Sequence, residues 1–405
     1  MNTIDNNATG PLAGLRVIEL GAFIAGPFCG QLLADLGADV IKVEPPGAGD
    51  PMRQWGMHQG NSIWWAVIGR NKRSITLDLR HAEGQALARR LIQTADVLVE
   101  NFRPGALEKW NLDPEELRRE HPGLVVARVS GFGQVGPYRG RPGFGSVAES
   151  MGGLRHLTGY PDRPPTRVGV SIGDSLAGVF AAFGVVSALY NREKREGRRQ
   201  GQTVDAAITD SVLAVLESAV SEYSAAGRVR QRTGPILPGV APSNLYPTSD
   251  ESWVLIAANS DGVFRRLAES MGKPELASDS RFATHSARGC NQEELDQLIA
   301  SWAITQKRKE LLALLARHEV PSGPVYDAAD VARDPHYRER GAVVDVETEE
   351  FGTLSMQGVV PKLSDTPGKI RWTGAPLGHH NAEVYGGILG LSADEIAKLR
   401  EERVI

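Results

Sequence analysis

Short apolar runs alternate with longer amphipathic runs along the first 130 residues of the chain. Residues 15–20 are rich in β-formers and end at Gly21, which is typical of a strand. Residues 27–36 then carry apolar side chains at helical spacing, which predicts a helix with one apolar face. The same reasoning predicts a helix at 81–94 and further strands at 40–44, 74–79, 97–100 and 124–129. Strands that alternate with helices form parallel βαβ units, so we expect an α/β fold with a doubly wound, Rossmann-like parallel sheet.

The pattern changes after residue 129. Residues 130–167 are rich in Gly and Pro and lead to a helix expected to start near Asp174, and residues 205–226 predict a second long helix. Further predicted elements are a Gly/Pro/Arg-rich boundary at 227–240, a strand at 253–258, short helices through residue 315, and a final helix at 392–402 with a capping box of Ser392 and Glu395. A chain of 405 residues has room for two domains, so we expect a large α/β domain and a smaller one in the latter half.

Composition narrows the function classes. The charged fraction is 23%, the apolar fraction 41% and the net charge -4, all ordinary for a globular cytoplasmic enzyme. A nearly neutral chain lacks the basic face that a nucleic-acid partner requires. Cys29 and Cys290 are far apart in sequence, so a reducing compartment is predicted rather than a disulfide framework. The most apolar stretch, residues 176–190, is shorter than the roughly 20 residues that span a bilayer, so a buried helix and no membrane partner are expected.

Several short motifs resemble sites for other chemistries but lack a necessary part. Residues 21–26 follow a strand and open a helix, as in a dinucleotide site, but the three-glycine spacing is absent. Residues 47–50 lack the Gly-Lys-Ser/Thr ending of a phosphate loop. His379 and His380 have no Cys or carboxylate cluster near them in sequence, so no metal site is expected. A serine hydrolase is disfavoured because no nucleophile elbow has convincing context.

Asp174 is the main candidate for chemistry. Apolar residues repeat with helical period after it, so its carboxylate is expected at the N-cap, where it accepts from free backbone N–H groups of the first turn. A purely structural cap is the alternative. Gly173 and Gly178 flank the aspartate, and we expect them to keep other side chains away and leave the carboxylate reachable.

The motifs that accompany Asp174 occur in a specific order along nearly the whole chain. They are Pro11-Leu12-Ala13-Gly14-Leu15-Arg16-Val17, Ala25-Gly26-Pro27, Leu36-Gly37-Ala38-Asp39-Val40-Ile41-Lys42-Val43-Glu44, Asn71-Lys72-Arg73-Ser74-Ile75, Val99-Glu100-Asn101-Phe102-Arg103-Pro104-Gly105, Gly131-Phe132-Gly133-Gln134, Val320-Pro321-Ser322-Gly323-Pro324-Val325 and Pro376-Leu377-Gly378-His379-His380. In this series the chain resembles the class III CoA-transferases, the family of formyl-CoA transferase and carnitine CoA-transferase.

The resemblance implies an architecture and a set of site residues. The expected fold is an interlocked-ring homodimer, in which residues 11–224 and 330–405 build the large CoA-binding domain and residues 225–329 the small α/β domain. Asp174 matches the family's catalytic aspartate. The positions implied to hold the nucleotide end of coenzyme A are Ile24, Ala25, Leu77, Asp78, Arg80, Asn101, Phe102, Arg103 and Lys109. Pro45 replaces an expected basic residue, and Lys42, Arg73 or Arg103 is expected to compensate.

The implied reaction uses no permanently bound cofactor, because the coenzyme A thioester is itself a substrate. A carboxylate that attacks a thioester forms a mixed anhydride, which the CoA thiolate converts to an aspartyl thioester. A Gly-rich loop closes the site in relatives, and Gly234 and Gly239 lie in the matching stretch here. Residues 49–56 and the Phe-Ile-Ala-Gly-Pro-Phe-Cys-Gly segment at 23–30 look most like relatives that use succinyl-CoA with malate, citramalate, itaconate or glutarate. Arg53 is a candidate for binding a distal carboxylate.

Two other functions compete with CoA transfer. The α-methylacyl-CoA racemases share the fold and the aspartate, but they pair it with a histidine, because proton transfer on both faces of a carbon needs two bases. The matching stretch here is Gly143-Phe144-Gly145, which cannot move a proton and also lacks the acid found in many transferases. A catalytically silent CoA-binding protein is the second alternative.

Overall fold

The computed structural model describes residues 9–194 and 200–405. The chain divides into two compact units: the first comprises residues 1–154, 168–221 and 334–405, and the second comprises Arg155–Arg167 and Glu222–Arg333. The expected small domain, residues 225–329, lies within the second unit. Residues 155–167 were expected in the first part of the large domain, but their contacts group them with the second unit.

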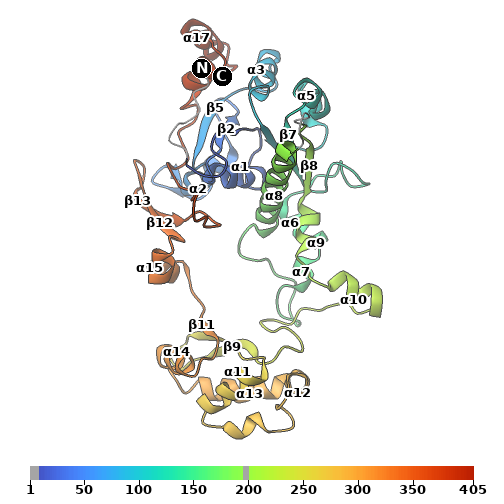
Figure 1. The fold of residues 1–405 in the computed structure, drawn as a ribbon, viewed down its shortest axis with the longest axis vertical. Coiled ribbons are helices and arrows are strands. Elements are labelled where there is room, and N and C mark those ends of the chain that lie inside the picture. The colour runs from blue at the N-terminus through green and yellow to red at the C-terminus, as the bar shows by residue number, and fades with distance from the viewer. Residues whose placement is uncertain (1–8, 195–199) are drawn as a thin grey trace. The chain divides into compact units, whose positions relative to one another are not determined.

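A six-stranded sheet in the order β5-β2-β1-β6-β7-β8 forms the centre of the first unit (Figure 1). All five strand pairs are parallel. The strands are β1 (Arg16–Glu19), β2 (Asp39–Glu44), β5 (Lys72–Thr76), β6 (Val97–Glu100), β7 (Val125–Ser130) and β8 (Thr203–Ala207). The predicted parallel α/β sheet is therefore confirmed, and its first five strands lie within three residues of the predicted bounds.

Helices cover both faces of this sheet, so its central strands are buried on both sides. Val17, Val40 and Val125 face a core shared with α1 (Ala25–Asp35), α8 (Ile172–Lys194) and α9 (Ile208–Ala214). The intervening strand residues face a second core, which contains α3 (Ala82–Ile92), α4 (Ala106–Lys109), α5 (Pro114–Glu120) and α17 (Ala393–Glu401). The C-terminal segment thus completes the first unit, and the predicted capping box at Ser392 and Glu395 is present.

Smaller elements surround the sheet in the first unit. They are η1 (Pro51–Gln54), β3 (Met57–His58), β4 (Asn61–Ser62), α2 (Ile63–Ile68), α6 (Gly145–Met151), α16 (Pro335–Glu339), β12 (Val343–Thr348), β13 (Gly352–Gln357) and the π-helix η3 (Glu383–Ile388). Two helices cross the boundary between the units, α7 (Leu154–Leu157) and α10 (Ala219–Ala226).

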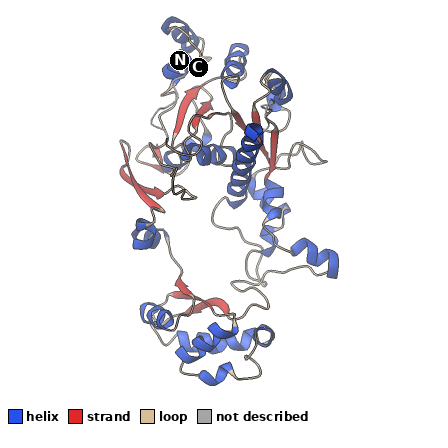
Figure 2. Ribbon diagram, viewed as in Figure 1, coloured by secondary structure: helices blue, strands red, loops and turns tan. Residues whose placement is uncertain are grey.

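The second unit is built on an antiparallel three-stranded sheet in the order β11-β10-β9 (Figure 2). Its strands are β9 (Ser243–Pro247), β10 (Trp253–Ala257) and β11 (Ser322–Pro324), and its helices are α11 (Asp261–Ser270), η2 (Pro274–Ala277), α12 (His285–Cys290), α13 (Gln292–Ala303), α14 (Arg308–Arg317) and α15 (Ala328–Arg333). Val254, Phe264 and Ile299 belong to its own hydrophobic core.

Two sequence-based expectations for helices were wrong. Residues 205–226 form no single helix: their first residues belong to β8, where they pair with β7, and α9 and α10 are separated by Glu217, whose φ of 52° is incompatible with a helix. The helix expected to start near Asp174 is present and starts at Ile172. That helix, α8, is also not fully buried, because Val179, Phe180, Phe183, Val186 and Tyr190 are exposed.

Helix α8 is long and apolar enough to cross a membrane by length and composition, with a mean hydropathy of 1.7 over its best window. In this fold it packs against the sheet and against α1. A Cβ built on Gly178 would lie 2.9 Å from the carbonyl oxygen of Ala25 and 3.0 Å from the ring of Phe28. Gly178 is therefore the contact point at which the two helices approach closely.

Candidate active site

Asp174 lies in the first turn of α8, as the third helical residue, and is half-buried. Its expected position as the N-cap is therefore wrong by three residues, since the residue before the helix is Ser171. The backbone N–H of the preceding residue, Gly173, donates to the carboxylate of Glu149 at 3.3 Å. Glu149 comes from α6 and is 1% exposed. A second, buried carboxylate thus binds the start of the helix that carries Asp174.

The glycines near Asp174 are required by packing. Gly173 is buried, and a Cβ there would lie 3.1 Å from Cγ of Glu149. Gly178 is buried against α1, so these two glycines serve close packing rather than access to the carboxylate, contrary to expectation. The glycine that makes room for Asp174 is Gly145, because a Cβ there would lie 2.6 Å from Cγ and 2.8 Å from Oδ1 of Asp174.

The loop between β1 and α1 is held by side chains from other strands. The amide of Asn101 accepts from the N–H of Ala22 at 2.7 Å and donates to the carbonyl of the same residue at 2.8 Å. Asp50 accepts from the N–H of Phe23 at 3.2 Å. Phe23 has a φ of 66°, and Ile24, the N-cap of α1, makes no side-chain capping bond.

Two buried lysines and two buried carboxylates form an ion network that stabilises this loop. Lys42 contacts Asp50 at 2.8 Å and Glu19 at 3.2 Å, and it also donates to the carbonyl of Gly21. Lys72 contacts Glu19 at 2.8 Å. Burial acts to lower the pKa of Lys42, but Asp50 and Glu19 raise it above the ordinary value. Burial lowers the pKa of Lys72, although Glu19 opposes this effect.

The structure separates the expected coenzyme A contacts into exposed and buried groups. Arg80, Arg103 and Lys109 are exposed, while Asp78 and Phe102 are half-buried. These residues follow β5 and β6 and therefore lie beyond the carboxyl ends of parallel strands, where α/β sheets bind ligands.

The remaining expected contacts have other roles in the structure. Arg73 is 7% exposed and is paired with Asp39 at 2.5 Å and with Glu383 at 2.8 Å, so it is no free phosphate ligand. Lys42, 1% exposed, is equally engaged and does not replace the basic residue missing at Pro45. Leu77 and Ala25 are buried, and the amide of Asn101 is used on Ala22. Contact with a ligand at these three positions would therefore involve the backbone.

Arg53 has internal partners that the sequence did not predict. Its Nε and Nη2 donate to the carboxylate of Glu44 at 2.7 and 2.8 Å, and Nη2 also reaches the carbonyl of Ala375 at 3.1 Å. The guanidinium lies 3.8 Å from the ring centroid of Trp65. One edge of the guanidinium is thus occupied, and a bidentate substrate contact through that edge would first have to displace Glu44.

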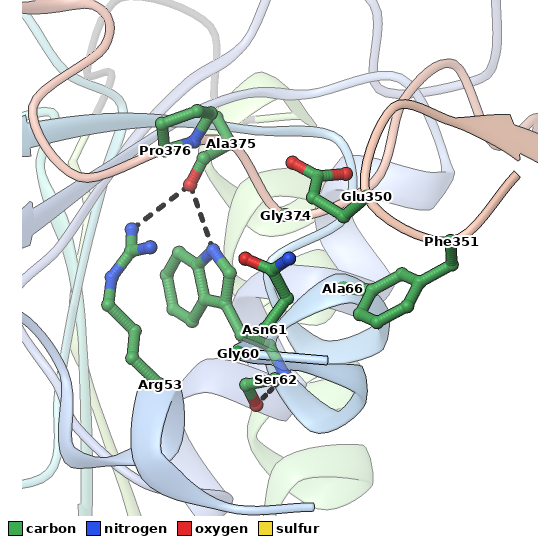
Figure 3. Close-up of a pocket in the computed structure, with 11 residues that line it drawn as sticks. Arg53, Gly60, Asn61, Ser62, Ala66, Glu350, Phe351, Gly374, Ala375 and Pro376 are labelled. Atoms are coloured by element: carbon green, nitrogen blue, oxygen red, sulfur yellow. Dashed lines mark hydrogen bonds between the residues drawn. The ribbon is translucent and has the colours of Figure 1, made fainter. Parts of the chain in front are cut away.

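A cavity of about 240 Å³ adjoins Arg53 (Figure 3). The C-terminal segment forms one wall, with Ala375 accepting hydrogen bonds from both Arg53 and the indole of Trp65. Glu350 and Phe351, from the turn between β12 and β13, line the same cavity. Arg53 therefore joins the N-terminal part of the unit to its C-terminal part at the cavity wall.

Gly234 and Gly239 both lie in the second unit and both have positive φ, 67° and 78°. Gly234 donates to the carbonyl of Gly159 at 3.0 Å, and Thr233 donates to the carbonyl of Ile236 at 2.7 Å. These bonds lie within the second unit, and the expected role of the two glycines in closing the site stays a prediction.

Among residues 9–194 and 200–405, no group of three or more His, Cys, Asp or Glu side chains is placed to hold a metal ion. His379 is exposed, and His380 is half-buried with its Nδ1 accepting from the N–H of Ser74 at 3.1 Å.

The family model for CoA-transferase family III matches residues 12–381. The chain belongs to this family. It is 56% identical over 397 residues to the succinyl-CoA–D-citramalate CoA-transferase of Chloroflexus aurantiacus, with 98% of both chains covered. It is 42% identical over 400 residues to the succinyl-CoA–L-malate CoA-transferase beta subunit of the same organism, again with 98% of both covered. The predicted family and enzyme class are therefore confirmed.

A solved structure supports the fold. The crystal structure of a CAIB/BAIF family protein from Brucella suis is 39% identical, and it matches with a TM-score of 0.83 over 94% of this chain and 99% of that chain. The chain is thus a CoA-transferase, a class of enzyme that uses coenzyme A thioesters as substrates.

Sequence reasoning missed three residues that shape this site. Glu149 gave a weak signal, as an acid in an otherwise small and apolar stretch four residues after Gly145. Asp50 and Phe23 gave none, because their roles depend on a backbone conformation and on a buried ion network that link β1, β2 and β5.

Proposed function

We propose that this CoA-transferase moves CoA from an acyl-CoA donor, succinyl-CoA, to a small dicarboxylate such as malate, citramalate, itaconate or glutarate, with Asp174 as the covalent nucleophile. The observation that carries the proposal is the half-buried carboxylate of Asp174 in the first turn of α8, with space beside it at Gly145. The positive end of the helix dipole favours an anion at this position. Relatives at 56% and 42% identity are named for succinyl-CoA with citramalate and malate.

The proposed reaction has four balanced steps. A carboxylate oxygen of Asp174 attacks the thioester carbon, the carbon–sulfur bond breaks, and a mixed anhydride and CoA thiolate form. The thiolate attacks the Asp174 carbonyl carbon of the anhydride, which releases the donor acid and leaves an aspartyl-CoA thioester. The acceptor carboxylate then attacks that thioester, its carbon–sulfur bond breaks, and a second anhydride and CoA thiolate form. The thiolate finally attacks the acceptor's acyl carbon, which gives the new acyl-CoA and releases the Asp174 carboxylate. Water enters no step, so the thioester energy is retained.

Backbone N–H groups at the start of α8 are the proposed donors to the tetrahedral oxyanions. The first N–H groups of a helix have no intrahelical partner and point toward a ligand at its N-terminus. Glu149 already accepts from Gly173, and this contact supports a fixed position for the turn that carries Asp174.

We propose that the phosphates of coenzyme A bind the exposed cations Arg80, Arg103 and Lys109, beside Asp78 and Phe102. All five follow the carboxyl ends of β5 and β6. Contacts to the backbone at Ile24, Ala25, Leu77 and Asn101 belong to the same proposal. Arg73 is left out of it because of its buried ion pairs.

A homodimer, with the subunits interlocked as rings, is also proposed. Its support is a stripe of exposed apolar side chains along α8, formed by Val179, Phe180, Phe183, Val186 and Tyr190. Such a stripe on a long helix is typical of a surface that is covered in the assembly. Light scattering on the purified protein tests this state, with a monomer mass as the contrary result.

Isotope exchange tests the reaction itself. With succinyl-CoA and labelled succinate, the wild type is expected to form labelled succinyl-CoA, and Asp174→Ala is expected to lose this exchange. Hydroxylamine added with the donor should leave a hydroxamate on Asp174. A racemase would instead exchange the α-proton of a 2-methylacyl-CoA with deuterium, and a silent binding protein would catalyse neither exchange. Full turnover by Asp174→Ala would overturn the proposal.

A further inference from the structure

Phe23 has an unusual backbone conformation for its residue type. Its φ of 66° lies in the left-handed region, which bulky non-glycine residues rarely adopt because the Cβ approaches the backbone. Strained residues persist only where the surrounding structure holds them, and they cluster at functional sites. The conformation of Phe23 must therefore be held by neighbouring groups, and its ring is a candidate for a functional role.

Three polar side chains, of which Lys42 and Asp50 are buried, hold the segment that contains Phe23. Asp50 accepts from its N–H at 3.2 Å, and Asp50 is in turn paired with Lys42 at 2.8 Å. Lys42 and Asp50 are each 1% exposed, so this pair is shielded from water. The amide of Asn101 bonds both the N–H and the carbonyl of the adjacent Ala22. The conformation of Phe23 is thus determined by strands β2 and β6 and by the start of η1.

The ring of Phe23 belongs to a group of aromatic side chains that we call the aromatic wall, formed by Phe23, Trp55 and Phe144. The ring centroid of Phe23 lies 5.9 Å from that of Trp55 and 6.3 Å from that of Phe144, the latter nearly perpendicular. Trp55 is 41% exposed and Phe144 is 65% exposed. The rings of Trp55 and Phe144 remain exposed and are available to contact a ligand, whereas the ring of Phe23 beside them is half-buried.

Two segments that carry the aromatic wall also contact the start of α8. Phe144 is followed by Gly145, whose missing side chain leaves the space that the carboxylate of Asp174 occupies. Two residues after Phe23, the carbonyl of Ala25 approaches α8 at Gly178, one helical turn beyond Asp174. These two chain connections favour a position of the wall near an acyl group carried by Asp174.

We propose that Phe23 is a specificity-determining residue whose strained conformation presents its ring, with Trp55 and Phe144, to the acyl group on Asp174 and excludes water from the anhydride. This inference rests on the proposed function. Water that reaches the anhydride attacks the acyl carbon, releases the free acid and regenerates the Asp174 carboxylate, while the CoA thiolate leaves protonated. Transfer then becomes thioester hydrolysis, so the ratio of hydrolysis to transfer measures the shielding directly.

The decisive variant is Phe23→Gly, because glycine adopts the left-handed conformation without strain and removes only the ring. Glu251→Gly is the matched control: Glu251 has a φ of 57° in the exposed turn between β9 and β10 of the second unit. For Glu251→Gly the melting temperature is expected to change little, and for Phe23→Gly it is expected to fall, because the ring packs against the buried cluster of Met52, Trp65 and Ile68. We expect Phe23→Gly to raise the ratio of hydrolysis to transfer of succinyl-CoA at least about tenfold, and Glu251→Gly to leave it unchanged.

Phe23→Leu, which keeps an apolar side chain, is expected to restore part of the shielding, and it covers the case in which Phe23→Gly is less stable than the wild type. A ratio unchanged within twofold in Phe23→Gly overturns the inference, as does a change of dimer mass with no change of ratio, which would assign the wall to a subunit contact. Failure of the proposed function is distinguishable, because the wild type itself would then show no exchange.

Discussion

The carboxylate of Asp174 occupies the space in which a side chain on residue 145 would stand. A Cβ built on Gly145 would lie 2.6 Å from Cγ and 2.8 Å from Oδ1 of Asp174, distances that real Cβ atoms do not tolerate. Glycine at 145 therefore removes a second proton-transferring group from the site and, at the same time, permits the observed conformation of the remaining carboxylate. The size of the side chain at position 145 therefore controls the position of the Asp174 carboxylate.

This coupling predicts the effect of one methyl group. Gly145→Ala should lower the rate of label exchange by at least about 100-fold, because displacing a reacting group by about 1 Å has an effect of this size. Stability should change little, since Ala is favoured over Gly in a helix by up to about 1 kcal/mol and offsets part of the clash. Gly140→Ala, in the preceding loop and with nothing within 4 Å of its new Cβ, should exchange like the wild type. Equal rates for the two variants would refute the coupling.

Glu149 should act on catalysis through the position of α8. Glu149→Ala removes the acceptor of the Gly173 N–H, so kcat should fall about tenfold or more while KM for both substrates changes less. Glu149→Gln keeps a carbonyl oxygen in the same place and should recover most of kcat. If Glu149→Gln is as impaired as Glu149→Ala, the negative charge itself is required and the positioning role is wrong.

Arg53 offers a test between an internal role and a substrate contact. Its buried ion pair with Glu44 predicts that Arg53→Ala destabilises the protein by about 3 kcal/mol and changes KM for donor and acceptor alike. Thermal unfolding and steady-state kinetics check both effects. Arg80→Ala, which removes an exposed pair with Asp78, should leave the melting temperature nearly unchanged. A selective rise in KM for the acceptor, without loss of stability, would restore Arg53 as the ligand of a distal carboxylate.

The lowered pKa of the His380 imidazole predicts that the stability of the protein depends on pH. Burial lowers the pKa of its imidazole below the ordinary value of about 6.5, with Glu383 opposing and His379 and Arg73 adding to the effect. The neutral ring is required because Nδ1 accepts from Ser74. For a lowered pKa, the contribution is present above the unfolded pKa and is lost as the pH falls through the folded one.

The melting temperature should therefore fall as the pH drops below about 6.5, and His380→Gln should reduce this slope. Unfolding curves at several pH values measure it. His379→Gln, on the exposed neighbour, serves as the control and should retain the slope. An unchanged slope in His380→Gln would show that other groups cause the dependence.

The first five strands of the parallel sheet could be predicted from sequence because each lies in a short run rich in β-branched and other apolar residues, bounded by turn residues or a helical pattern. The sixth could not. Residues 205–207 are predicted as part of a helix until Asp205 is paired with Arg128 of β7, and that pairing joins segments more than seventy residues apart. Likewise, the sequence does not reveal Glu149 as the partner of the Gly173 N–H, because Glu149 lies on another helix.

The sequence by itself determined the family, the α/β class and Asp174 as the candidate nucleophile, since local periodicity and ordered motifs carry this information. The tertiary structure decided which charged groups are available to a ligand: it paired Arg73 and Arg53 internally and left Arg80, Arg103 and Lys109 exposed. It also decided the conformation of Phe23. Burial and pairing depend on residues distant in the chain, and those distances become short only in the folded protein.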